Sequence, residues 1–315
     1  MTTELDRVLE TVSSLARERG YTCRLVRPDR VLLSGPTVFT LPLNEIRRRV
    51  RTHPVAAWPG VVADCIDAVA VTLETDRDNP LDYSDFGVMR HLIRTRLYGT
   101  ASVGSDGVRR VVAPGLIQRV LIDRVHMVVP VTYAMLARWP IGEWELFQLA
   151  EDNVRGDGGV HIDTLHIDSV HTGTLDTGGL HPPTGPEDIG PIARLRGPEY
   201  LTAHARWLGD HPVTGPEGAV LTMPSKESIY ACPVVGPGLA DSVDALAVLA
   251  TVHADDPWPV NSNVYWWRDG SLDLAATTFR RDTTIHIGYT DTYVRHSTRL
   301  GLGAPPRTDT RRERP

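Results

Sequence analysis

The stretch YTCRLVRPDRVLLSGPTVFTLP, residues 21–42, decides the class of fold at the start of this chain. It holds three short runs of β-branched and apolar residues, separated by the turn sequences Pro28-Asp29 and Gly35-Pro36. Before it, apolar residues recur at helical spacing over 4–19, and Gly20 can end that helix in a left-handed conformation. The pattern predicts a helix packed on a small antiparallel meander.

Three further helices are expected before residue 100. One follows Pro42, with an apolar face at Leu43, Ile46 and Val50, and the others cover 61–73 and 83–98, the last with Asp82 as its N-cap. The stretch 99–107 is then rich in Gly, Ser and Thr, which favours a domain boundary. We therefore expect an N-terminal α+β domain at 1–98 and a linker at 99–108.

The remainder reads as a larger mixed α/β domain over 109–302, followed by a disordered tail at 303–315. Strands are expected at 111–112 and 120–131, a helical pair at 132–154 and a long apolar helix at 239–253. Two antiparallel hairpins complete it, one within 218–235 and one turned by Asp269-Gly270. The fold class predicted for the whole chain is α+β.

Composition indicates a folded, cytoplasmic protein. Of the 315 residues, 41% are apolar and 23% are charged, close to the averages of globular proteins. The three cysteines are scattered and odd in number, which is typical of reduced thiols rather than of a disulfide framework. The first twenty residues carry charges where a signal peptide needs an apolar run, and no eighteen apolar residues follow one another. No membrane contact is expected.

The formal net charge of −6 makes nucleic acid an unexpected partner, because nucleic-acid binders usually carry an excess of basic groups. Lys226 is the only lysine among 33 basic residues, a bias that GC-rich coding explains most simply. Arginines at 47–51 could still form a local basic face, and a regulator that touches nucleic acid through them is the weakest of three functional hypotheses.

A five-residue repeat over 161–181 is the most conspicuous candidate site. Its imidazoles and carboxylates are ligands of divalent metals, and the candidates are His161, Asp163, His166, Asp168 and His171. On one extended strand His161 and His171 would lie about 33 Å apart, so only a hairpin could bring these side chains together. The alternative is a polar hairpin without metal. No other cofactor is evident.

Three shorter segments also carry polar or aromatic groups. The aromatic run Tyr265-Trp266-Trp267-Arg268 alternates along an expected strand, which places one tryptophan in the core and leaves Trp267 or Trp266 with Arg268 as a binding surface. The cluster from His253 to Trp258 could bind a divalent ion or transfer a proton, although a helix end followed by a turn explains it equally well. Ser225-Lys226 raises the idea of an activated serine, but a turn between strands is the better interpretation.

The order of elements resembles that of the YtpQ-like family, an uncharacterised group of bacterial proteins. The similarity lies in the strand at 115–123, the helical pair at 131–139 and 143–153, and the Pro-Ser-Lys-Glu turn within 219–227, where the family tends to have Pro-Ser/Asn-Arg-Asp. It continues through the bend and hairpin at 253–270. The resemblance implies an intracellular bacterial α/β protein of unknown role, with no activity to carry over.

The sequence holds no Walker loop, no dinucleotide-binding glycine motif after a strand, no HExxH and no kinase signature. The leading hypothesis is therefore a non-catalytic binding or accessory protein with a protein partner. Its rival is a metal-dependent, hydrolase-like enzyme that uses the segment 161–181.

Overall fold

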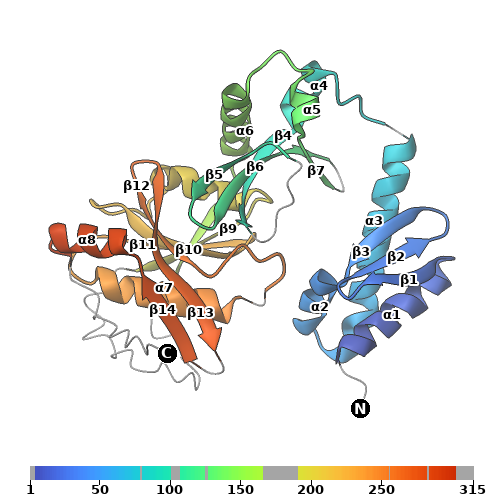
Figure 1. Ribbon diagram of the computed structural model, residues 1–315, viewed down its shortest axis with the longest axis horizontal. Helices are drawn as coiled ribbons and strands as arrows, with labels where there is room; N and C mark the ends of the chain where they lie inside the picture. Colours follow the sequence, from blue (N-terminus) through green and yellow to red (C-terminus); the bar gives the residue numbers. More distant parts are fainter. Residues whose placement is uncertain are drawn as a thin grey trace, which may run out of the picture.

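The computed structural model describes residues 4–78, 80–100, 107–124, 127–165, 191–254, 256–281 and 284–302. Within these ranges the protein is a mixed α+β structure with three antiparallel sheets. The three-stranded sheet and its helices stand apart from the rest of the ribbon (Figure 1). We call residues 4–78 the N-terminal unit and the part from residue 80 onward the body.

The N-terminal unit has the predicted helix and meander. Helix α1 (Glu4–Glu18) is followed by Gly20, whose φ of 79° gives the left-handed helix end. Strands β1 (Thr22–Arg27), β2 (Arg30–Ser34) and β3 (Val38–Pro42) form the meander in that order. Helices α2 (Leu43–Arg51), η1 (Val55–Ala57) and α3 (Trp58–Asp78) complete the unit, whose core joins apolar residues of α1, α2, α3 and the three strands.

Residues 55–75 are the one helical stretch in the described part of the chain that is long and apolar enough to cross a membrane. In the structure 28% of its apolar window is buried, and Trp58, Val62 and Ile66 enter the core of the N-terminal unit. The core helix of a soluble protein meets the same criterion of length and composition. This helix therefore does not by itself indicate a membrane.

The helix predicted at 83–98 is wrong over its second half. Helix α4 (Phe86–Leu92) is short, its N-cap is Asp85 rather than Asp82, and the chain then enters strand β4 (Ile93–Gly99). Residues 93–99 pair along their whole length with a later strand, β6 (Leu116–Asp123). This non-local ladder overrides the local helical spacing of apolar residues, which is the usual reason for such an error.

The second sheet contains β4, β6, β5 (Arg109–Ala113) and the short β7 (Val128–Pro130). Helices α5 (Tyr133–Leu136) and α6 (Glu143–Asp157) contribute to its core, together with Met89 of α4. Residues 93–99 thus belong to the same sheet as the residues on the far side of the expected linker at 99–108. The division between core clusters falls earlier, between Leu73 and Leu81.

The third sheet has seven strands in the order β14-β13-β12-β10-β11-β9-β8. Their bounds are β8 (His161–Leu165), β9 (Ile192–Arg196), β10 (Ala219–Ser225), β11 (Ser228–Pro233), β12 (Val264–Arg268), β13 (Ser271–Arg281) and β14 (Thr284–Tyr289). Helices α7 (Leu239–Val252) and α8 (Asp291–Arg299) pack on one face. The other face packs on η4 (Leu201–Asp210) and on residues of the second sheet.

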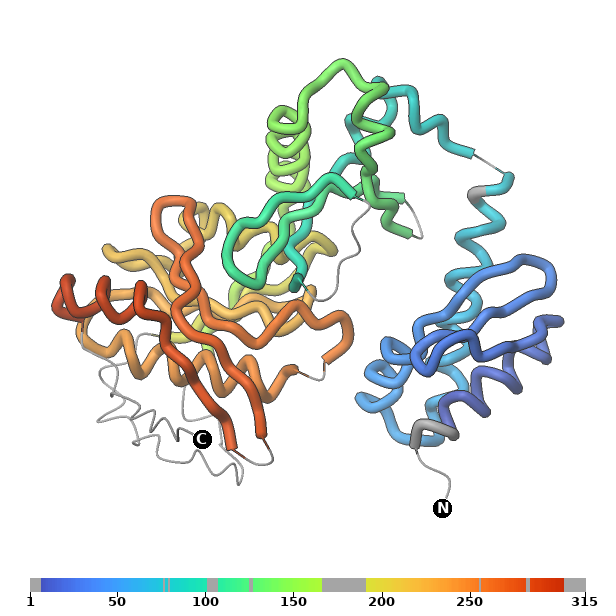
Figure 2. The backbone as a smooth tube through the Cα atoms, viewed as in Figure 1, coloured from blue at the N-terminus to red at the C-terminus, as the bar shows by residue number. Residues whose placement is uncertain are grey.

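The backbone crosses between the two units once, after α3 (Figure 2). The hairpins predicted within 218–235 and around Asp269-Gly270 are both present, at 219–233 and 264–281, and the second turns at Asp269 and Gly270 with φ of 47° and 81°. The tail at 303–315 lies outside the described residues.

A substitution at Gly99 tests how closely β4 approaches the loop before β12. A Cβ added at Gly99 would overlap the backbone carbonyl oxygen of Val260, whereas one added at Gly60 in α3 meets no atom. We expect Gly99→Ala to lower the free energy of unfolding by about 2 kcal/mol. The matched change Gly60→Ala should raise it by about 0.5 kcal/mol, because alanine favours a helix over glycine. Urea unfolding of both variants measures this, and equal effects would contradict the close packing of β4 on that loop.

Candidate functional site

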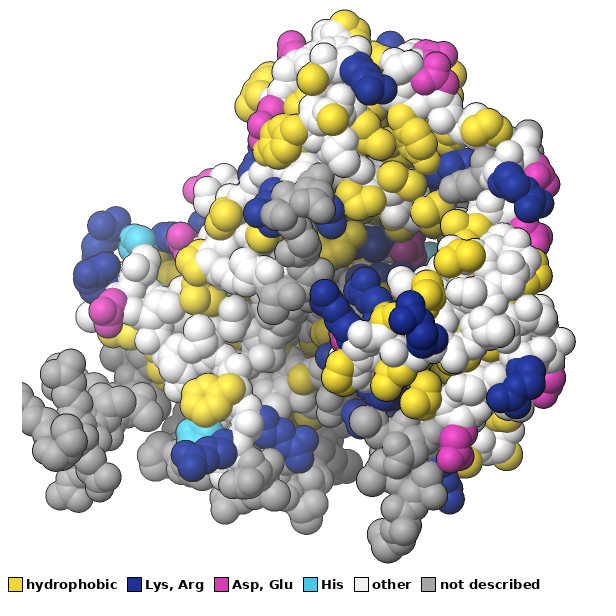
Figure 3. All heavy atoms as spheres, turned by 45° about the vertical axis from the view of Figure 1, so that its right-hand side comes forward, with side chains coloured by type: hydrophobic (Ala, Val, Ile, Leu, Met, Phe, Trp, Pro, Cys, Tyr) yellow, Lys and Arg dark blue, Asp and Glu magenta, His cyan; other side chains and the backbone are white. Residues whose placement is uncertain are grey.

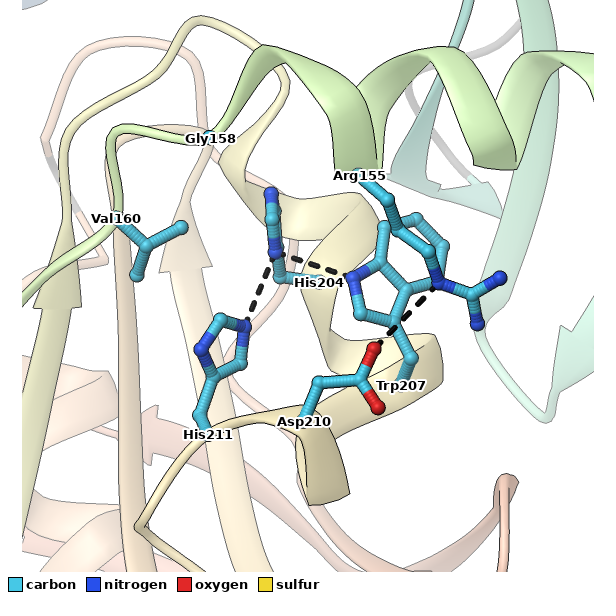
Figure 4. Close-up of a pocket in the computed structure, with 7 residues that line it drawn as sticks. All are labelled: Arg155, Gly158, Val160, His204, Trp207, Asp210 and His211. Carbon is cyan, nitrogen blue, oxygen red and sulfur yellow. Dashed lines mark hydrogen bonds and ion pairs between the residues drawn. The ribbon is translucent and has the colours of Figure 1, made fainter.

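Two histidines and a tryptophan meet on η4 and just after it. The element consists of two short helical turns separated by a kink at Trp207, whose φ and ψ are −124° and 46°. His204, before the kink, lies between the Trp207 indole and the ring of His211, after it (Figure 4). The two imidazole centroids are 5.2 Å apart, as are those of His204 and Trp207.

The hydrogen bonds among these rings fix where the protons lie. Trp207 Nε1 donates to His204 Nδ1 over 3.1 Å, and an indole nitrogen can only donate. His204 Nδ1 must therefore carry a lone pair, and the proton of the neutral ring is on Nε2. His211 Nε2 lies 3.1 Å from the same His204 Nδ1, so it must be the protonated nitrogen of that pair.

His204 is held in its neutral form. Its side chain is only 3% exposed, and burial, assisted by the neighbouring His211, lowers its pKa to about 4. Burial lowers the pKa of His211 too, while Asp210 opposes this. At neutral pH the pair is therefore uncharged.

His204 Nε2 is a buried donor without a hydrogen-bond partner among the described residues. The residue His204 lines a cavity of about 250 Å³ (Figure 4). The C-terminal end of α6 forms the opposite wall, where Gly158 and Gly159 turn the chain toward β8 with φ of 61° and 79°. The full lining is Arg155, Gly158, Val160, His204, Trp207, Asp210 and His211.

Arg155 and Asp210 form the charged side of this cavity. The Arg155 guanidinium lies over the Trp207 indole, 4.6 Å from its centroid, and Arg155 Nε is 3.5 Å from Asp210 Oδ2. In Figure 4 the arginine head group lies on the far side of the indole from His204. The two charges compensate each other, which leaves the space beside the imidazoles without a strong net field.

The metal ligands predicted within 161–181 are only partly described. His161 and Asp163 lie on β8, where Asp163 receives hydrogen bonds from Arg196 that lower the pKa of its carboxyl. His166, Asp168 and His171 lie outside the described residues. Among the described side chains no three His, Cys, Asp or Glu are grouped to hold a metal ion. The metal site stays a prediction.

Trp266 and Trp267 of the predicted binding surface lie on opposite faces of β12, and Arg268 lies over the Trp266 ring, 4.7 Å from its centroid. Trp266 is 1% exposed and donates from Nε1 to the Glu217 carbonyl within the core under α7. Trp267 and Arg268 line a second, more polar cavity of about 650 Å³ beside Glu217, Asp269 and Asp273. Arg268 is paired there with Asp273 at 3.1 Å.

The segments around His253 and Ser225 make contacts within the body. His253 Nδ1 lies 2.8 Å from Asp256 Oδ2, and its Nε2 lies 3.0 Å from the buried Tyr230 hydroxyl. This chain of contacts ties the end of α7 to β11. Ser225 ends β10, and Lys226 follows it in the predicted turn.

No protein-family model, curated protein or solved structure matches the chain. The cavity at η4 was not anticipated from the sequence either. His204, Trp207 and His211 are spaced three and then four residues apart, which on a regular helix would put them on one face, and this spacing is the signal that the sequence offers.

The neutral state of His204 predicts a loss of stability in acid. The unfolded chain takes up this proton near pH 6.5, but the folded chain does so only near the pKa of about 4, so stability falls as the pH drops through this window. Between pH 7.5 and 5 we expect His204 alone to cost about 2 kcal/mol.

Urea unfolding at the two pH values measures this cost. His204→Gln should lose about 2 kcal/mol less than the wild type over that interval, and the exposed His91→Gln should match the wild type. An equal loss in His204→Gln and the wild type would show that the folded imidazole is not held neutral.

Proposed function

We propose that this chain is a non-catalytic binding protein and that the cavity beside His204 holds a small ligand with a hydrogen-bond-accepting oxygen. The observation that carries the proposal is the Nε2–H of His204, which is buried, belongs to a residue of the cavity lining and lacks a partner in the described part of the chain. A buried donor without an acceptor costs about 1–3 kcal/mol, and native proteins seldom leave one unmatched. A ligand oxygen removes this cost.

The size and walls of the cavity narrow the class of ligand. A volume of about 250 Å³ lies below the usual range of drug-sized sites, which favours a small molecule. Val160 and the Trp207 indole offer apolar contact, and the His211 ring adds a second nitrogen. A carbonyl or carboxylate oxygen on a small apolar body suits these walls.

The lining residues support binding rather than covalent chemistry. Among the described residues around the cavity there is no serine, threonine, cysteine or lysine to act as a nucleophile. The single carboxylate, Asp210, is paired with Arg155. His204 Nδ1, the nitrogen that could act as a base, already accepts the indole proton.

The other functional expectations remain proposals. A metal-dependent enzyme would need the segment 161–181, and the Asp163 carboxylate is engaged by Arg196. A protein partner, a cytoplasmic location and kinship with the YtpQ-like family rest on sequence pattern alone.

Titration with small probes tests the proposal. Acetate, acetamide, benzoate and benzamide share an acceptor oxygen and differ in charge and apolar body, and tryptophan fluorescence with calorimetry follows their binding. We expect at least one of them to bind the wild type. His204→Phe, which keeps a ring but loses the donor, should weaken that binding about tenfold, the value of one hydrogen bond.

The exposed His91→Gln is the matched control and should bind like the wild type. Binding that is equally strong in His204→Phe, or the failure of all four probes to bind the wild type, would contradict the proposal.

A further inference from the structure

Helix α2 of the N-terminal unit reaches the body at Trp258. The Trp258 backbone N–H donates to Glu45 Oε2 over 3.3 Å, and the Arg49 guanidinium lies 4.5 Å from the centroid of the Trp258 ring. Figure 1 shows α2 as the part of the N-terminal unit nearest to the loop before β12. In the space-filling view, Lys and Arg side chains gather beside a hollow near the middle of the face (Figure 3).

The only lysine of the chain lies over the same indole. Lys226 Nζ is 3.9 Å from the Trp258 ring centroid, and its side chain is 13% exposed. The Lys226 backbone N–H also donates to the Trp258 carbonyl over 3.0 Å. Trp258 has a φ of 52°, an uncommon value for a bulky residue, so its surroundings hold it in a strained conformation.

Glu199 links this contact to the cavity. Its carboxylate accepts hydrogen bonds from Lys226 at 2.9 Å and from Arg96 at 2.6 Å. Glu199 stands two residues before η4, the element that carries His204 and Trp207. A shift of Lys226 would therefore act on a residue joined to the start of η4.

We propose that the contacts of Glu45 and Arg49 with Trp258 form a latch that holds the N-terminal unit on the body, and that its release changes the cavity at His204 through Lys226 and Glu199. The effect of release on the cavity rests on the proposed function, because docking of the N-terminal unit would then control ligand binding. The chain crosses between the units once, so loss of the latch frees the unit to move about that crossing. A released state removes Glu45 and Arg49 from Trp258, over whose ring Lys226 lies, and Lys226 is the residue that binds Glu199.

The single lysine makes the latch directly measurable. Acetic anhydride at limiting concentration acylates Lys226 and the N-terminal amine, and mass spectrometry of the digest compares the two. We expect Arg49→Ala to raise the acylation rate of Lys226 at least fivefold relative to the N-terminal amine. Arg24→Ala, an exposed arginine on β1 of the same unit, should leave it unchanged.

Small-angle X-ray scattering of the same variants reports the separation of the units. The radius of gyration should rise in Arg49→Ala and in Trp258→Ala and stay constant in Arg24→Ala. If the rate and the radius stay at wild-type values in Arg49→Ala and Trp258→Ala, the latch is overturned.

The coupling has a separate readout that needs no ligand. The ring Cε1–H signals of His204 and His211 in a ¹³C-labelled sample should move in Arg49→Ala and remain in place in Arg24→Ala. If the latch opens by acylation and scattering while both imidazole signals stay unchanged, the coupling is overturned and the latch stands. Failure of the four small probes to bind would instead remove the proposed function and leave both of these results intact.

Discussion

The hydrogen bond from Trp207 to His204 is the constraint on which the account of the site depends. An indole nitrogen cannot accept, so this single contact determines which nitrogen of His204 bears the proton. His211 Nε2 contacts the same acceptor, so it must carry the proton of the His211 ring. The result is a buried donor, the Nε2–H of the cavity-lining His204, with no acceptor among the described residues. A buried donor of this kind is satisfied only when an acceptor from outside these residues, such as a ligand oxygen, binds to it.

Aromatic rings with a cation above them recur at the important junctions of this structure. Arg155 covers Trp207 at the cavity, Arg49 and Lys226 cover Trp258 between the units, and Arg268 covers Trp266 beside the second cavity. Arginine suits this use, because its planar head group stacks on a ring and can still donate to a carboxylate. The strong preference for arginine in the sequence thus has a structural use, whatever its origin in the coding of the chain.

Local pattern was enough to predict the elements that close over short distances. The helix and meander at 4–42 and the hairpin at Asp269-Gly270 depend on neighbours in sequence, and their turn residues adopt the expected backbone conformations. Strand β4 could not be recognised in this way, because its partner β6 lies beyond the stretch that was expected to be a linker. The same pairing draws residues 93–99 into the body rather than into the N-terminal unit.

The site was harder to predict than the fold for a related reason. His204 and His211 converge only because the backbone kinks at Trp207, and the opposite wall comes from the end of α6, more than forty residues earlier. The segment predicted as a metal site, 161–181, lies largely outside the described residues. A repeat of His and Asp can be recognised in the sequence as a candidate metal site. The role of a buried histidine depends on its neighbours in space, which the sequence pattern does not show.

A long-range ¹H–¹⁵N correlation spectrum of the wild-type imidazoles at neutral pH tests the central claim most directly. It reports, for each ring, which nitrogen carries a proton. The account predicts a neutral His204 protonated at Nε2 alone, with Nδ1 showing the shift of a hydrogen-bond acceptor. A His204 protonated at Nδ1, or at both nitrogens, would contradict it.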